Sequence, residues 1–205
     1  MQPDYWEQAI HSISERDPVL KDLIQIYSGS ILNSRGDAFS TLARSIVGQQ
    51  ISVKAAESVW QRLVSHVQQA TPISIHIAET NALRSCGLSS RKVSYLKDLS
   101  RSFMSGELIP EKLVTLDDDL LVVELVKVNG IGRWTAEMFM IFFLMRPNVL
   151  PLDDIGLQRA MSQHYNQKRP LTKQEMRKIA QKWEPWRSVA TWYLWRSLDP
   201  VPVEY

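Results

Sequence analysis

One stretch decides the fold of this chain: Val126-Lys127-Val128-Asn129-Gly130-Ile131-Gly132-Arg133-Trp134-Thr135-Ala136. An amphipathic helical pattern precedes it, and an intensely apolar one follows as far as Met145. Two glycines flank one isoleucine between these patterns, and glycine reaches positive φ without a Cβ penalty. The composition therefore predicts a very tight turn between two helices, with Ile131 pointing inward as an apolar pin.

The second helix is expected to begin at or near Gly132, with its first backbone N–H groups unpaired. Such amides, backed by the helix dipole and free of side chains at both glycines, form a concave cradle for an anion. A phosphodiester oxygen fits this cradle. On motif length alone, a plain connection between two helices is an equally good interpretation.

A second informative stretch is Leu150-Pro151-Leu152-Asp153-Asp154-Ile155-Gly156-Leu157. Here the chain leaves the apolar helix, turns at a proline and presents two adjacent carboxylates just before another helical segment. One carboxylate can cap that helix while the other faces a cleft. In an arbitrary protein, capping alone is the more common role of such a pair.

These two stretches together resemble the helix-hairpin-helix DNA glycosylase superfamily, whose signature is the hairpin, a Gly/Pro-rich loop and an invariant aspartate. The residues that carry the resemblance are Gly130 to Ala136 and Pro151 to Asp154. Two further stretches, Ala43 to Ser52 and Trp183 to Ser188, narrow it to the bacterial DNA-3-methyladenine glycosylase II type, which removes alkylated purines. The resemblance runs from residue 38 to residue 198, and several motifs in the right order are more specific than any one of them.

Length and composition fit this interpretation. The 205 residues suffice for one domain or for two small lobes. The formal charge of +2 means that a polyanion must be met by a local patch. The single cysteine, Cys86, excludes internal disulfides and the four-cysteine iron–sulfur cluster of some relatives, and it fits a reducing cytoplasm. The polar start of the chain has no signal-peptide pattern, and the most apolar run is too short to span a membrane. We therefore expect a cytoplasmic protein with no membrane partner.

Apolar residues at helical spacing predict an all-α protein of about a dozen helices. Asp17-Pro18, Ser52 and either Ser89 or Ser90 are the expected helix starts. The predicted helices span residues 4–14, 18–27, 38–47, 52–67, two short segments within 73–83, one segment from 90, then 116–128, 133–145, 156–165, 172–183 and 186–198.

The resemblance implies two lobes. Residues 38–146 would form a central helical bundle that carries the hairpin, and residues 1–37 together with 147–205 would form the second lobe. The active site would lie in the cleft between the lobes. Asp154 falls where the chain passes from one lobe to the other.

A glycosylase must hold the DNA backbone, because it rotates the target nucleotide out of the helix before it acts. The expected grip comes from the amides around Gly130, Gly132 and Trp134, with help from Lys127 and Arg133. The Arg91-Lys92 helix start is a further candidate, although a solvated face is the better interpretation there. Relatives also bind a cation through hairpin backbone carbonyls, which side chains cannot reveal. No other cofactor and no metal ligands are expected.

The hole left in the duplex must be filled by a wedge residue. In the resembling family the wedge lies in the loop that matches Gly48-Gln49-Gln50-Ile51, at the position of Gln50. Some relatives have leucine at this position. Because this chain has the polar Gln50 there, the apolar form of the wedge is not expected. An equally good interpretation is a simple interhelix turn in which Gln49 hydrogen-bonds the backbone.

The chain has seven tryptophans, and an indole face attracts a cationic alkylated purine. Trp134 and Trp195 match positions that line the base pocket in the resembling family. Met138 and Ile155 match positions that are aromatic in some relatives, which implies a different substrate range. Trp183 and Trp186 are expected to serve packing or the joining of lobes.

The predicted reaction is hydrolysis of the N-glycosidic bond. A carboxylate close to C1′ stabilises the positive charge that develops on the sugar and can activate water, and Asp154 is the predicted catalytic residue. Asp153 is expected to cap the helix or to support Asp154. Alkylated purines are already cationic, so their departure needs no general acid. Bifunctional relatives have a lysine where this chain has Trp134, so the enzyme is expected to be monofunctional and to leave an intact abasic site.

Three functions therefore remain in view, each acting on duplex DNA. The first is an alkylpurine glycosylase, a monomer that takes damaged duplex DNA as its partner. The second is a helix-hairpin-helix glycosylase for a deaminated or oxidised base, which the Met138 and Ile155 positions keep open. The third is a non-catalytic DNA-binding module, since such hairpins also occur as plain backbone clamps.

Overall fold

The computed structural model describes residues 3–34 and 36–198. All regular secondary structure in these residues is helical, which confirms the all-α prediction. The described residues form two compact units: residues 3–34 with 145–198 make up the first unit, and residues 36–144 make up the second unit. The chain thus changes unit after residues 34 and 144, where the sequence predicted changes after residues 37 and 146.

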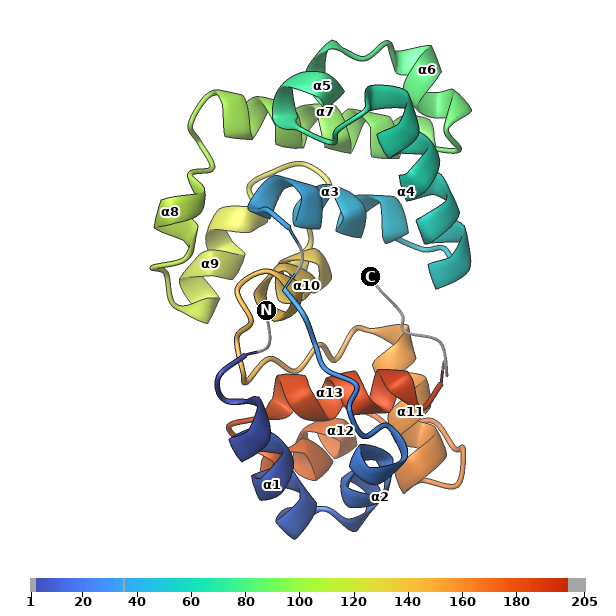
Figure 1. Ribbon diagram of the computed structural model, residues 1–205, viewed down its shortest axis with the longest axis vertical. Helices are drawn as coiled ribbons and strands as arrows, with labels where there is room; N and C mark the ends of the chain where they lie inside the picture. Colours follow the sequence, from blue (N-terminus) through green and yellow to red (C-terminus); the bar gives the residue numbers. More distant parts are fainter. Residues whose placement is uncertain (1–2, 35, 199–205) are drawn as a thin grey trace. The chain divides into compact units, whose positions relative to one another are not determined.

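The second unit contains the hairpin and is built around α3. The helix α3 packs against α4, α7 and α10, while α5 packs along α7 (Figure 1). The core of the unit is formed by apolar side chains such as Leu42, Ile46, Leu96 and Phe139, each buried almost completely. The helices are α3 (Ala38–Gly48), α4 (Val53–Val67), α5 (Pro72–Ile77), α6 (Thr80–Ser85), α7 (Ser90–Met104), α8 (Pro110–Leu113), α9 (Asp118–Leu125) and α10 (Arg133–Phe142).

Several helix starts in this unit are those the sequence predicts. Ser52 caps α4 and Ser89 caps α7, each accepting a hydrogen bond from a backbone N–H of the first turn. Both hairpin helices are shorter than predicted. The helix α9 ends at Leu125 because the next residues form a tight turn, and α10 ends at Phe142 shortly before Met145, which takes a left-handed φ of 54°. The short α8 was not predicted, since four residues are too few to show a helical period.

The first unit is built around α13. This helix packs against α1, α2 and α11, and η1 packs against α1 and α12 (Figure 1). The segment predicted as one helix over residues 172–183 is a helix followed by a 3₁₀ turn. The elements are α1 (Trp6–Arg16), α2 (Pro18–Ile26), α11 (Ile155–Tyr165), α12 (Lys173–Ala180), η1 (Gln181–Trp183) and α13 (Arg187–Arg196). Across the described ranges, no helix is long and apolar enough to cross a membrane.

Asp17 holds the first unit together from its core. Its buried carboxylate caps α2 and accepts hydrogen bonds from Tyr165 Oη and Trp183 Nε1, both at 2.7 Å. Lys182 Nζ lies 3.1 Å from the same carboxylate. Burial acts to raise the pKa of Asp17, but the hydrogen bonds from Trp183 and Tyr165 and the ammonium group of Lys182 outweigh it and hold the pKa below its usual value. This contact gives Trp183 the packing role expected of it.

The pKa of Asp17 predicts a loss of stability in acid. Because folding lowers this pKa, the stability that Asp17 contributes is present above about pH 4 and is lost as the pH falls through the folded value. We expect the Tm of the protein to decrease as the pH is lowered beneath about 4. The decrease should be less steep in the Asp17→Asn variant, whose side chain at this position has no proton to take up. Thermal unfolding followed by circular dichroism across this range measures the effect. Parallel declines in both proteins would contradict it.

Candidate active site

The hairpin between α9 and α10 has the tight turn that its glycines predict. Gly130 takes a φ of 89°, in the left-handed region that favours glycine. Ile131 is 4% exposed, and its N–H donates to the Val128 carbonyl oxygen at 3.0 Å, which confirms the buried apolar pin. The helix α10 follows at once, with Gly132 as its N-cap.

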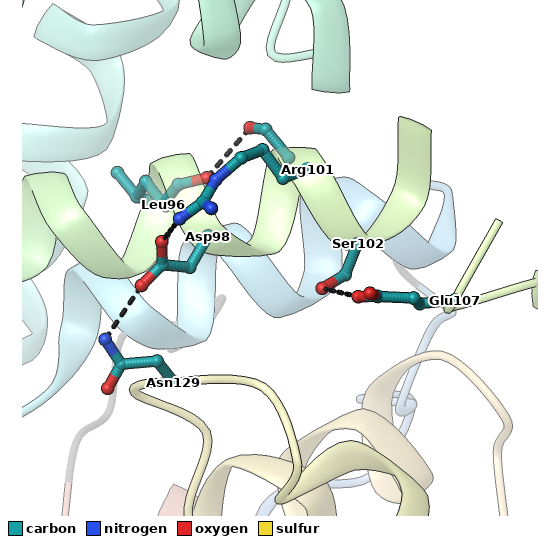
Figure 2. Close-up of polar contacts among 7 residues, drawn as sticks. Leu96, Asp98, Arg101, Ser102, Glu107 and Asn129 are labelled. Carbon is teal, nitrogen blue, oxygen red and sulfur yellow. Dashed lines mark hydrogen bonds and ion pairs between the residues drawn. The ribbon is translucent and has the colours of Figure 1, made fainter. Parts of the chain in front are cut away.

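Two side chains of α7 hold the hairpin loop. The Tyr95 ring lies against Gly130, so that a Cβ on this glycine would be 2.1 Å from Tyr95 Cγ. Asn129 Nδ2 donates to Asp98 Oδ2 at 2.7 Å, and Arg101 pairs with the other oxygen of that carboxylate (Figure 2). Neither Tyr95 nor Asp98 was singled out from the sequence, because nothing in the local pattern of α7 indicates which loop it will support.

The start of α10 is open to solvent. Gly132 has extended backbone, makes no side-chain cap and leaves empty the space that a Cβ would take. Two cations lie beside it: Arg133 is 61% exposed and Lys127 is 62% exposed. Each cation pairs with its own carboxylate: Arg133 Nε lies 3.2 Å from Glu137 Oε1, and Lys127 Nζ lies 2.7 Å from Glu124 Oε1. This arrangement suits an anion that approaches the exposed helix N-terminus.

The loop between α3 and α4 contacts the hairpin through Gln49. Its Nε2 donates to the Gly130 carbonyl oxygen at 2.8 Å and to Thr135 Oγ1 at 3.2 Å. Gln50 is exposed and takes a left-handed φ of 59°. The backbone hydrogen bonding that the sequence offered as one role for Gln49 is therefore present.

The start of α7 departs in part from its predicted solvated face. Lys92 Nζ donates to the Val47 carbonyl oxygen at 2.6 Å, near the end of α3. Burial lowers the pKa of Lys92. The solvated interpretation is therefore wrong for Lys92, whose half-buried side chain donates to a backbone carbonyl of α3, while Arg91 is exposed as expected.

Asp154 is the N-cap of α11. Its Oδ1 accepts hydrogen bonds from the Leu157 N–H at 2.6 Å and from Trp195 Nε1 at 2.7 Å. Asp154 is 7% exposed and Trp195 is 5% exposed. Of the two roles expected for Asp153, the helix cap is wrong: α11 begins at Ile155, so Asp154, directly before it, takes the cap. Asp153 is exposed and pairs with Lys173.

Gly156 adds a constraint that the sequence did not reveal. A Cβ at this position would lie 3.0 Å from Asp154 Oδ1 and 3.2 Å from Trp195 Cδ1. The glycine therefore lets the indole approach the carboxylate closely. In the sequence, Gly156 lies only two residues after the predicted catalytic Asp154. The reason for a glycine there becomes clear only when the position of α13, which carries Trp195, is known.

The other predicted pocket residues differ in exposure. Ile155 is 62% exposed, Trp134 is half-buried, and Met138 is 2% exposed. Trp186 stacks on Tyr5 with a ring separation of 5.6 Å, as a packing residue would. Within residues 3–34 and 36–198, no group of three or more His, Cys, Asp or Glu side chains could hold a metal ion.

This combination of hairpin, helix-capping aspartate and all-helical fold defines a class of DNA repair protein. The family described as HhH-GPD superfamily base excision DNA repair protein matches residues 43–185. The chain belongs to this superfamily.

Individual relatives agree with this assignment. The DNA-3-methyladenine glycosylase 1 of Schizosaccharomyces pombe is 32% identical over 183 residues, which cover 87% of this chain and 80% of the relative. Among solved structures, the S. pombe 3-methyladenine DNA glycosylase in complex with abasic DNA aligns with a TM-score of 0.85 and 30% identity, over 93% of this chain and 96% of that one. A DNA-3-methyladenine glycosidase from Bacillus halodurans aligns with a TM-score of 0.76 and 33% identity, over 96% and 92% of the two chains.

Proposed function

We propose that this protein is a monofunctional DNA glycosylase of base excision repair, which removes alkylated purines of the 3-methyladenine and 7-methylguanine type from duplex DNA. One observation carries the proposal: the family's aspartate, Asp154, is held at the N-terminus of α11 by a hydrogen bond from the indole of Trp195. The S. pombe and B. halodurans relatives, which are named for 3-methyladenine, support this substrate class.

Asp154 is the proposed catalytic residue. The Leu157 N–H and the Trp195 indole N–H both donate to Oδ1, so they fix the direction of the carboxylate before substrate arrives. A negative charge in a largely buried position stabilises the cationic sugar of the transition state more strongly than it would in water. The same group orients or deprotonates the attacking water. The alkylated base leaves as a neutral molecule and needs no acid.

DNA binding is the proposed role of the hairpin. The open N-terminus of α10 would receive a backbone phosphate, and Lys127 and Arg133 would add positive charge beside it. The exposed Gln50 would fill the space that the flipped nucleotide leaves. The proposed partner is thus duplex DNA that contains a damaged base, and the proposed active form is a monomer.

The residues proposed to contact the flipped base are Trp134, Met138, Ile155 and Trp195. Indole faces favour a base that carries positive charge, which fits purines alkylated at N3 or N7. The exposed aliphatic chain of Ile155 adds apolar contact without an aromatic face.

The substrate class can be tested with duplex oligonucleotides that each contain one defined lesion. We expect release of 3-methyladenine and 7-methylguanine, and little release of uracil or 8-oxoguanine. Release of only a deaminated or oxidised base would instead establish a glycosylase for another lesion. Binding without release of any base would favour the plain backbone clamp.

A methyl group added at Gly156 should disturb the catalytic pair. The Cβ of a Gly156→Ala variant would lie 3.0 Å from Asp154 Oδ1 and 3.2 Å from Trp195 Cδ1, so the carboxylate and the indole must each give way by a few tenths of an ångström. We expect the single-turnover rate of base release to fall about tenfold, because a small misplacement of a catalytic group is costly. The Tm should change little, since alanine favours the helix. An unchanged rate would show that this close approach does not matter for catalysis.

The absence of strand cleavage is a further expectation. Trp134 occupies the position where bifunctional relatives have the lysine that attacks C1′. We expect damaged duplex DNA treated with the protein to keep an intact strand until the abasic site is cleaved by alkali. Borohydride should trap no covalent complex between protein and DNA. A trapped complex would overturn the monofunctional assignment.

A further inference from the structure

We propose that Gln49 is a positioning residue, which fixes the wedge loop to the DNA-gripping hairpin so that the two act on the duplex as one rigid piece. The wedge loop is defined here as residues 48–51, between α3 and α4. This inference rests on the proposed function, because it presupposes that Gln50 enters the duplex. It assigns to Gln49 a task within the protein.

The amide group of Gln49 is occupied by the hairpin. Its Nε2 donates to the Gly130 carbonyl oxygen at the tip of the turn, and also to Thr135 Oγ1 in the first turn of α10. Thr135 is 1% exposed, so the second contact is sheltered from water. One side chain therefore bridges the two segments that are proposed to touch DNA.

The wedge loop is also held just before its first residue. Lys92 Nζ donates to the Val47 carbonyl oxygen, one residue before the loop begins. Between this anchor and Gln49 little backbone is left to move. The next residue, Gln50, takes a φ of 59° that costs energy for a residue with a Cβ, and the fixed neighbours maintain it. The Gln50 side chain is left exposed at the tip of the loop.

The hairpin to which Gln49 binds is itself fixed. The Tyr95 ring lies against Gly130. Asp98, also on α7, accepts a hydrogen bond from Asn129 Nδ2 (Figure 2). A displacement of the wedge loop therefore cannot be absorbed by the hairpin. The spacing between the proposed phosphate site on the hairpin and the inserted Gln50 therefore depends on the side chain at position 49, on its length and on its ability to donate a hydrogen bond.

The test uses a duplex that requires no catalysis. It contains a tetrahydrofuran abasic analogue with 2-aminopurine opposite, whose fluorescence reports the stacking that a wedge disturbs. We expect wild-type protein to change this fluorescence on binding, and Gln50→Ala to abolish the change. Gln49→Met keeps the length of the side chain but loses the donor, and Gln49→Glu presents an acceptor to the Gly130 carbonyl. Both should reduce the change about tenfold in amplitude or in rate, because the part-buried Gly130 carbonyl loses its side-chain donor.

A matched control is Gln61→Met, which makes the same change at an exposed position of α4 outside the wedge loop and the hairpin. This variant should behave as wild type. A fluorescence change in Gln49→Met equal to that of wild type would overturn the inference, and so would the absence of any change with the wild-type protein. Retained duplex binding by Gln49→Met separates a wedge defect from loss of the grip.

Excision rates provide a second measurement. With a lesion paired in the duplex, Gln49→Met should lower the single-turnover rate about tenfold. With the same lesion opposite an abasic site, the loss should be about twofold or less, since no base pair must be opened before the lesion flips out. Equal losses on both substrates would show a merely structural role. If wild type releases no base from either substrate, the proposed function fails, while the fluorescence measurement still decides the role of Gln49.

Discussion

Asp154→Asn lowers the rate of base release by about 100-fold or more, while the variant still folds and still binds duplex DNA. The large effect is expected because the substitution removes the negative charge that faces the cationic sugar in the transition state. It also removes the group that activates water. The rate under single-turnover conditions measures the chemical step, and binding to an abasic-analogue duplex is followed in parallel.

The fold of this variant should survive because asparagine keeps an oxygen at Oδ1. That oxygen can still accept from the Leu157 N–H and from Trp195 Nε1, and asparagine is as good an N-cap as aspartate. Asp153→Asn is the matched control, since this carboxylate is exposed and pairs only at the surface with Lys173. We expect it to keep nearly full activity. If both variants release base at the wild-type rate, Asp154 is a helix cap and not the catalytic group.

Gly130→Ala is expected to destabilise the protein by about 3 kcal/mol and to lower its Tm by roughly 10 °C. Two costs combine at this position. The left-handed φ of 89° is unfavourable for alanine, and its Cβ would lie 2.1 Å from Tyr95 Cγ, so the ring or the hairpin must move. Because Gln49 donates to the carbonyl of the same residue, the wedge loop should be disturbed as well. Thermal unfolding and DNA binding measure the two effects.

Gly132→Ala is the matched comparison, because it makes the same change two residues further on. Its Cβ would meet nothing within 4 Å, and its φ of −99° is open to any residue. Stability should therefore change by about 1 kcal/mol or less. DNA binding should weaken, since a methyl group would stand where the phosphate is proposed to approach. Equal losses of stability in the two variants would contradict the different roles given to the two glycines.

The sequence predicted those parts of the structure whose causes are local. The glycines of the hairpin, Ser52 and Asp17 as helix caps, and the apolar spacing of the helices all act within a few residues, so they can be recognised without a fold. Helix ends were less well predicted. The helix α10, for example, ends at Phe142 within a run of apolar residues, and no local pattern indicates this end.

The candidate site was predicted only in part for the same reason. Asp154 was recognised through a family motif, but its hydrogen bond from Trp195 joins residues 41 positions apart. The support that Tyr95 gives to Gly130 and the contact of Gln49 with the hairpin are likewise long-range. Such contacts depend on how α3, α7 and α13 pack, and this packing cannot be recognised from local patterns in a single sequence. The family resemblance led to the catalytic role proposed for Asp154, and the structure provided its surroundings.

The most direct test of the proposed activity is chromatography of the free bases that the purified wild-type protein releases from methylated duplex DNA. We predict that 3-methyladenine and 7-methylguanine appear as free bases, while the DNA strand stays intact until alkali is added. Bound but unprocessed methylated DNA, with no free base in the supernatant, would contradict the account and leave a protein that only grips the DNA backbone.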